Sequence, residues 1–114
     1  MRAERISPTF PADDIAAAVK LLTAVLGCAP TFVDGERWAQ FDVNGSRVAL
    51  AGTDREGDGP SLSVKVHGLD ATSARLRAAG FDVGEPVSGP HERRAVIRPD
   101  HGFDWTVVLY EPAG

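Results

Sequence analysis

The chain contains an internal repeat, and this repeat constrains its fold more than any other feature. In the first half, residues 5–11 alternate apolar and polar side chains and lead into an amphipathic helical pattern that ends at Gly27. In the second half, an alternating run begins at Ser61 and leads into a helical pattern that ends at Gly80. Two copies are too few for a solenoid. The pattern therefore predicts two β-α-β-β-β modules that share one sheet system, with a cleft between them as the first place to look for function.

Both predicted helices have recognisable signals at their ends and on one face. Asp13 or Asp14 can cap the first helix, and Gly27 suits the left-handed conformation that ends many helices. The buried stripe of this helix is predicted from four apolar residues at helical spacing: Ile15, Val19, Leu22 and Leu26. The second helix has a weaker stripe, formed by Leu69, Leu76 and Ala79.

The remaining segments read as short strands and turns within a single domain of residues 1–114. Asn44-Gly45 between two alternating runs is the strongest hairpin signal. Module one covers about residues 5–51, a glycine-rich and charged linker covers 52–60, and module two covers about 61–111. Besides the first strand of each module, the predicted strands are 31–33, 38–43, 47–51, 81–83, 93–98 and 105–110, while residues 84–92 are predicted to form a loop.

The composition excludes several classes of function. The net charge is −4 and no stripe of Lys and Arg is present, so nucleic acid is not an expected partner. Charged residues interrupt every apolar stretch, and the first residues lack the apolar core of a signal peptide, so a membrane is not expected either. The lone cysteine, Cys28, has no partner for an internal disulfide, which suits a cytoplasmic protein.

Three features together resemble the vicinal oxygen chelate superfamily, which includes glyoxalase I, bleomycin-resistance proteins and extradiol dioxygenases. They are an aspartate-started helix ending in Leu-Gly, the repeated strands, and a Pro-Asp-x-Gly turn before the last strand. The resemblance extends from about Arg5 to Glu111 and is most evident in Asp14–Gly27 and His91–Gly102. It implies an α+β fold in which two βαβββ modules form a cup-shaped mixed sheet with helices on the convex side. It also implies a homodimer.

The same resemblance locates the positions at which enzymes of this superfamily hold a divalent metal. His, Glu or Gln side chains on the first and last strands of each module provide the ligands in those enzymes. The corresponding residues here are Ser7, Ala49, Ser61 and Val108. Neutral hydroxyl and alkyl side chains do not bind such a metal tightly, so neither a metal nor another cofactor is expected. The histidines are interpreted as surface or turn residues: His67, His91 and His101.

Strand alternation predicts which side chains line the cup. If Leu62, Val64 and Val66 face the helices, then the residues between them face the concave side. The same parity places Trp105 on the helix-facing side. The predicted ligand-binding residues are Trp38, Gln40, Arg47, Ser61, Ser63, Lys65, Arg94 and Tyr110. Aromatic faces, cations and hydroxyls are typical of small-molecule pockets. In the alternative interpretation, Trp38 only fills the barrel and the cations extend into solvent.

These features support three functional hypotheses. The first is a metal-free binding protein, similar to the bleomycin-resistance branch, that sequesters a planar, antibiotic-like aromatic molecule without bond chemistry. The second is an enzyme of the same superfamily, with or without a metal, that acts as a lyase, isomerase or dioxygenase. The third is a regulatory or structural member that acts only by dimerising. Family analogy alone does not decide between them.

Overall fold

The computed structural model describes residues 2–99 and 102–113, and the chain divides into two compact units. The first unit is Ser7–Pro60, and the second combines the residues up to Ile6 with those from Ser61 onward. The boundary after Pro60 coincides with the predicted end of the linker, whereas the first residues of the chain belong to the second unit.

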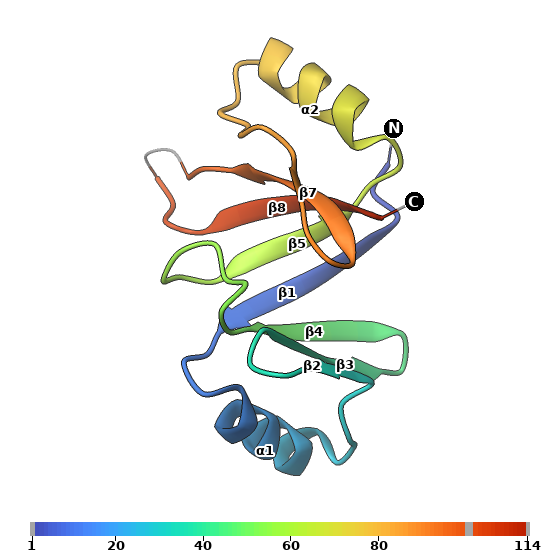
Figure 1. The fold of residues 1–114 in the computed structure, drawn as a ribbon, viewed down its shortest axis with the longest axis vertical. Coiled ribbons are helices and arrows are strands. Elements are labelled where there is room, and N and C mark those ends of the chain that lie inside the picture. Colours follow the sequence, from blue (N-terminus) through green and yellow to red (C-terminus); the bar gives the residue numbers. More distant parts are fainter. Residues whose placement is uncertain (1, 100–101, 114) are drawn as a thin grey trace. The chain divides into compact units, whose positions relative to one another are not determined.

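The elements follow the predicted β-α-β-β-β order twice, which confirms an α+β fold with two modules (Figure 1). The first repeat consists of β1 (Arg5–Pro11), α1 (Ile15–Leu26), β2 (Phe32–Asp34), β3 (Trp38–Val43) and β4 (Ser46–Ala51). The second repeat consists of β5 (Ser61–Lys65), α2 (Leu69–Ala78), β6 (Val87–Ser88), β7 (Glu92–Ile97) and β8 (Thr106–Pro112). Within each repeat the first and last strands are parallel, and the other pairings are antiparallel.

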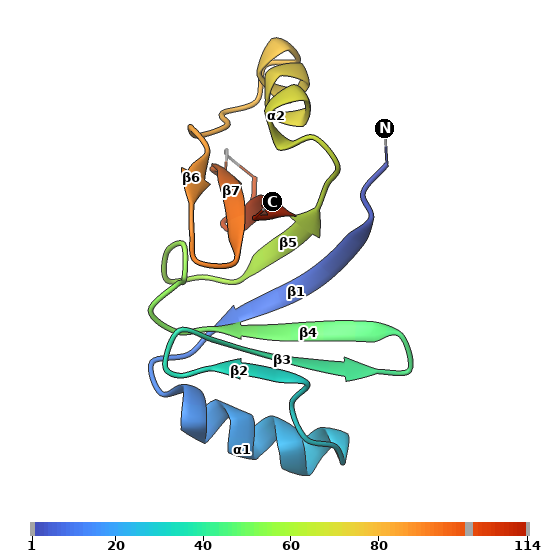
Figure 2. The same cartoon turned by 45° about the vertical axis from the view of Figure 1, so that its right-hand side comes forward.

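In the first unit, α1 packs against β3 and β4, and the helix runs beside the strands in Figure 2. Asp14 caps the helix, because its Oδ1 accepts a hydrogen bond of 3.1 Å from the Ala17 N–H. Gly27 ends the helix with a φ of 73°, as expected for a left-handed C-terminal residue. The core consists of Ile15, Ala39, Phe41 and Leu50, flanked by the remaining members of the predicted stripe: Val19, Leu22 and Leu26.

The β3–β4 hairpin turns at Asn44 and Gly45, as predicted. Both residues have a positive φ, 49° and 84°, which is the backbone conformation that a two-residue hairpin loop of type I′ requires. This turn fixes the register of the strands, so that Trp38 lies opposite Ala51 and Gln40 lies opposite Ala49. The register determines which side chains share each face of the sheet.

In the second unit, the strand order is β5-β8-β7-β6, and α2 packs on the sheet through a small core. The buried members of this core are Val66, Leu69, Val83, Ala95 and Leu109. Since alternate residues of a strand point to opposite faces, Ala95 and Leu109 mark the helix-facing side of β7 and β8.

The start of α2 is capped by a residue from β8 rather than by its own N-cap, Gly68. Glu111 Oε2 accepts a hydrogen bond of 3.1 Å from the Leu69 N–H, and Glu111 Oε1 lies 3.0 Å from Arg93 Nη1. Arg93 also binds Asp70, with 3.1 Å between Nη2 and Oδ1. The hydrogen bond to Asp70 and the negative charge of Asp70 raise the pKa of Arg93 above its ordinary value, so this guanidinium stays charged. The network joins α2 to β7 and β8.

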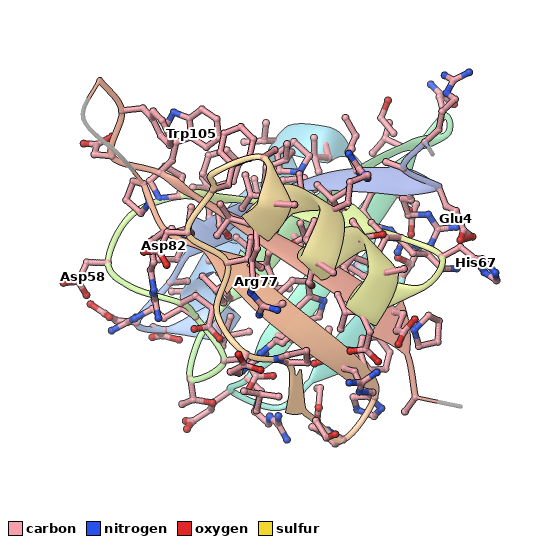
Figure 3. All side chains as sticks on the ribbon, turned by 90° about the horizontal axis from the view of Figure 1, so that it is seen from above. Glu4, Asp58, His67, Arg77, Asp82 and Trp105 are labelled. Carbon is pink, nitrogen blue, oxygen red and sulfur yellow. The ribbon has the colours of Figure 1, made fainter. Side chains whose placement is uncertain are left out.

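The chain after α2 differs from the prediction. Residues 81–83 do not form a strand, because only Val83 makes an isolated bridge, to Ile97. The Arg77 side chain, labelled in Figure 3, donates hydrogen bonds to the carbonyl oxygens of Val83 and Gly84 in this segment. A short strand, β6, instead lies at Val87–Ser88, inside the segment predicted to be a loop.

Two further predictions in this unit are wrong. Ala79 is exposed, because it is the C-cap of α2 and no longer follows the helical stripe. Trp105 does not face the helix: it precedes β8, is 42% exposed and contacts Phe103, with 4.8 Å between the ring centroids. Strand alternation does not extend to a residue outside the strand. Figure 3 shows Trp105 at the periphery of the molecule. The predicted turn at Asp100 and His101 lies outside the described residues.

Within residues 2–99 and 102–113, neither helix is long and apolar enough to cross a membrane.

Candidate functional site

The candidate site residues of the first unit lie on the sheet face opposite α1. Ala39, Phe41 and Leu50 pack against the helix, so the alternating neighbours in β3 and β4 point to the other face. The predicted residues Trp38, Gln40 and Arg47 all belong to that face, which is the parity that the sequence predicted.

Trp38 and Gln40 form a hydrogen-bonded pair on this face. The indole N–H of Trp38 donates to Oε1 of Gln40 over 3.2 Å. The residues directly opposite them on β4 are Ala51 and Ala49, whose side chains are single methyl groups. Both alanines are buried, whereas Trp38 and Gln40 are half-buried. An indole ring can stack against a flat ligand, and the amide of Gln40 adds polar atoms that can fix its orientation.

Arg47 is not a free cation. Its Nε lies 2.8 Å from Oδ1 of Asp42, which is the residue opposite it in the hairpin. Asp42 also accepts a hydrogen bond of 2.6 Å from the Thr31 hydroxyl. Asp42 is a member of this face that the sequence pattern did not identify. Two signals in the sequence could have identified it. Asp42 is four residues after Trp38, so it points to the same face of β3, and it lies across the Asn44-Gly45 turn from Arg47.

Strand β1 adds two buried hydroxyls. Ser7 and Thr9 are 2% and 3% exposed, whereas the alternating apolar residues Ile6 and Phe10 are 56% and 48% exposed. Thr9 Oγ1 donates to the Ser7 carbonyl oxygen over 2.9 Å, but Ser7 Oγ has no hydrogen-bond partner among the residues that the structure describes. A buried hydroxyl without a partner is costly, so it is available to a ligand or a water molecule.

In the second unit, the predicted residues again lie on the face opposite the helix. Lys65 lies directly opposite Tyr110, and Tyr110 lies directly opposite Arg94 on its other side. Ser63 and Ser61 lie on the same face, two and four residues before Lys65 along β5. The five residues are therefore on one surface of this unit.

The four positions at which the resemblance would place metal ligands carry neutral side chains. Ser7 and Ala49 lie on the paired strands β1 and β4, Ser61 and Val108 lie on the paired strands β5 and β8, and none of the four has a carboxylate or an imidazole. Across the described parts of the chain, no group of three or more His, Cys, Asp or Glu side chains could hold a metal ion. His67 is at the outer surface (Figure 3), and His101 lies outside the described residues.

A separate hollow of about 350 Å³ lies on the first unit and includes none of the predicted residues. Its lining residues are Pro11, Asp13, Arg55 and Asp58. Arg55 Nη1 lies 2.6 Å from Asp13 Oδ1, so the cation of this hollow is already paired with an exposed carboxylate. A surface ion pair of this kind does not indicate a ligand.

Comparisons with known proteins confirm the fold. No family model and no curated protein matches the chain. Among solved structures, a protein described as an NAD-dependent benzaldehyde dehydrogenase from Legionella pneumophila has a TM-score of 0.83 at 14% identity, covering 96% of this chain and 100% of that one. Methylmalonyl-CoA epimerase from Streptomyces coelicolor has a TM-score of 0.75 at 18% identity, covering 99% and 97%.

A member of the glyoxalase/bleomycin resistance protein/dioxygenase superfamily from Vibrio splendidus has a TM-score of 0.64 at 16% identity, covering 96% of this chain and 98% of that one. The predicted α+β fold is thus that of known structures over nearly the whole chain. The activities named for these proteins differ from one another, so the shared fold does not determine the function of this protein.

Proposed function

We propose that the protein is a metal-free member of the vicinal oxygen chelate superfamily that binds and sequesters a planar aromatic, antibiotic-like small molecule. The observation that carries the proposal is the face around Trp38. This face combines an indole, a hydrogen-bonding amide and small neighbours with the Thr9 hydroxyl and the Ala49 methyl group, which do not bind a metal tightly. Capture would be stoichiometric, through stacking on Trp38 and polar contacts from Gln40 on the same face. A cytoplasmic location stays a prediction from the lone Cys28.

An enzyme is the second candidate, because methylmalonyl-CoA epimerases share the fold. Proton transfer at such a site requires a carboxylate or imidazole that is free to accept a proton. On the face around Trp38, the carboxylate of Asp42 is already engaged, because it accepts hydrogen bonds from Arg47 and from the Thr31 hydroxyl. This arrangement favours binding over catalysis.

Metal analysis tests the metal-free proposal against the metal-dependent form of the second candidate. Because Ser7, Ser61, Ala49 and Val108 provide no strong ligands, purified protein is expected to contain far less than one transition metal per chain and to lack glyoxalase-type turnover. Inductively coupled plasma mass spectrometry and a glyoxalase assay measure this directly. One tightly bound metal per chain, removed by a chelator together with an activity, would refute the proposal. Native mass spectrometry of the same sample would detect a ligand that co-purifies.

We also propose that the protein is a homodimer. Helix α1 supports this, because its sequence contains only two polar residues, Lys20 and Thr23, and leaves Leu21 and Val25 63% and 68% exposed. A helix that is apolar on its outer side as well as its inner side is usually covered on both.

Multi-angle light scattering at micromolar concentration is therefore expected to give the mass of a dimer. Leu21→Lys places a charge in the proposed contact and should shift the equilibrium toward the monomer, whereas Lys20→Ala should not. A monomer mass for the unaltered protein at that concentration would rule out this assembly.

A further inference from the structure

Three donors in the second unit lie side by side on the sheet face opposite α2. The register pairs Lys65 of β5 with Tyr110 of β8, and Tyr110 with Arg94 of β7. Neighbouring strands are about 4.8 Å apart, so the two cations start about 10 Å apart with the phenol between them. Both side chains are long enough to converge above Tyr110. We call these three residues the cation row.

Two members of the cation row have unused hydrogen-bonding capacity. In the described part of the chain, the Lys65 ammonium and the Tyr110 hydroxyl form no hydrogen bond or ion pair, although both side chains are partly buried. Arg94 is partnered, since Glu92 Oε1 lies 3.6 Å from its Nη1. Among the described residues, the Lys65 charge is therefore the one in the cation row that no carboxylate balances.

Away from the cation row, the same face of the sheet first carries apolar side chains and then an uncharged polar one. Next to the cation row, Val108 lies between Ser63 and Val96. Two residues before Val108, Thr106 is 9% exposed, and its Oγ1 has no hydrogen-bond partner within residues 2–99 and 102–113. Successive residues on one face are about 6.6 Å apart along a strand. The face thus offers cations, then methyl groups, then an unpaired buried hydroxyl.

We infer that the cation row binds a carboxylate, and that the ligand is a small amphipathic organic acid whose apolar part lies against Val96 and Val108. This inference goes beyond the proposed function, because the cation row lies in the second unit and Trp38 lies in the first. A carboxylate accepts hydrogen bonds from both cations and from the phenol, and such charge-assisted bonds are the strong ones. An aromatic ring a few carbon–carbon bonds from the carboxylate reaches the valines and leaves Thr106 for a polar substituent.

Hydrocinnamate and its neutral analogue hydrocinnamamide test the inference, because they differ in charge and hardly in shape. Titration calorimetry with the full chain is expected to show that the acid binds about tenfold to a hundredfold more tightly than the amide. Lys65→Met and Arg94→Met should each bring this ratio toward one, mainly by weakening the acid. Lys65→Arg should retain the preference for the acid, because it keeps the charge.

Lys20→Met is the matched control, since Lys20 is an exposed lysine on α1 of the other unit. It should leave the ratio unchanged. A ratio near one in the unaltered protein, or a ratio that neither methionine variant changes, would overturn the carboxylate site while leaving small-molecule binding in place. Absence of binding by both probes at millimolar concentration would also overturn it. The proposed function fails separately, if a co-purified ligand binds without any contribution from Trp38.

Discussion

Phe41→Ala is expected to lower the free energy of unfolding by about 3–5 kcal/mol, the usual range for removing a buried phenylalanine. Phe41 is 0% exposed and packs with Ile15, Ala39 and Leu50 between β3 and α1. Replacement with alanine leaves a cavity beneath the helix that the surrounding strands can fill only in part. A urea titration followed by circular dichroism measures the change, with the m-value showing whether the same amount of structure still unfolds.

Phe81→Ala is the matched control, because Phe81 is 57% exposed and belongs to neither core. Its loss is expected to cost less than about 1 kcal/mol. Equal midpoints for the two variants would show that the interface between α1 and the sheet does not carry the stability assigned to it.

The first unit was predictable because several local signals agree there. The Asp14 cap, the helical spacing from Ile15 to Leu26 and the positive φ of Asn44-Gly45 each specify the same element boundaries. Once that hairpin turn is fixed, the period of two places Trp38, Gln40 and Arg47 on one face without further information. The parity of the candidate site therefore follows from local sequence.

The remaining errors arise from contacts that strand and helix periodicity does not report. The segment after α2 pairs with Ile97 only at Val83 and is bound by the Arg77 side chain, and Trp105 contacts Phe103 outside β8. Likewise, the sequence predicts that Arg47 faces the site, but the structure is needed to see that Asp42 neutralises it.

Trp38→Ala is expected to weaken ligand binding by about one to two orders of magnitude. Stacking on an indole contributes roughly 0.5–1.5 kcal/mol beyond the burial of apolar area, and the two contributions together amount to about 2–3 kcal/mol. Trp38 lies opposite Ala51 and donates a hydrogen bond to Gln40, so its ring is held on the face where the ligand would stack. The measurement is a fluorescence titration with the ligand that native mass spectrometry recovers from the purified protein.

The chain has two tryptophans, which makes the attribution direct. Trp105→Phe leaves Trp38 as the only indole fluorophore and should leave both affinity and quenching intact, because Trp105 lies before β8 against Phe103. Trp38→Phe retains an aromatic ring but loses the hydrogen bond to Gln40, so an affinity between those of the unaltered protein and Trp38→Ala would identify stacking as the main contribution. If Trp38→Ala binds as tightly as the unaltered protein, then the indole only fills space on the sheet, and the proposed stacking site on the first unit is refuted.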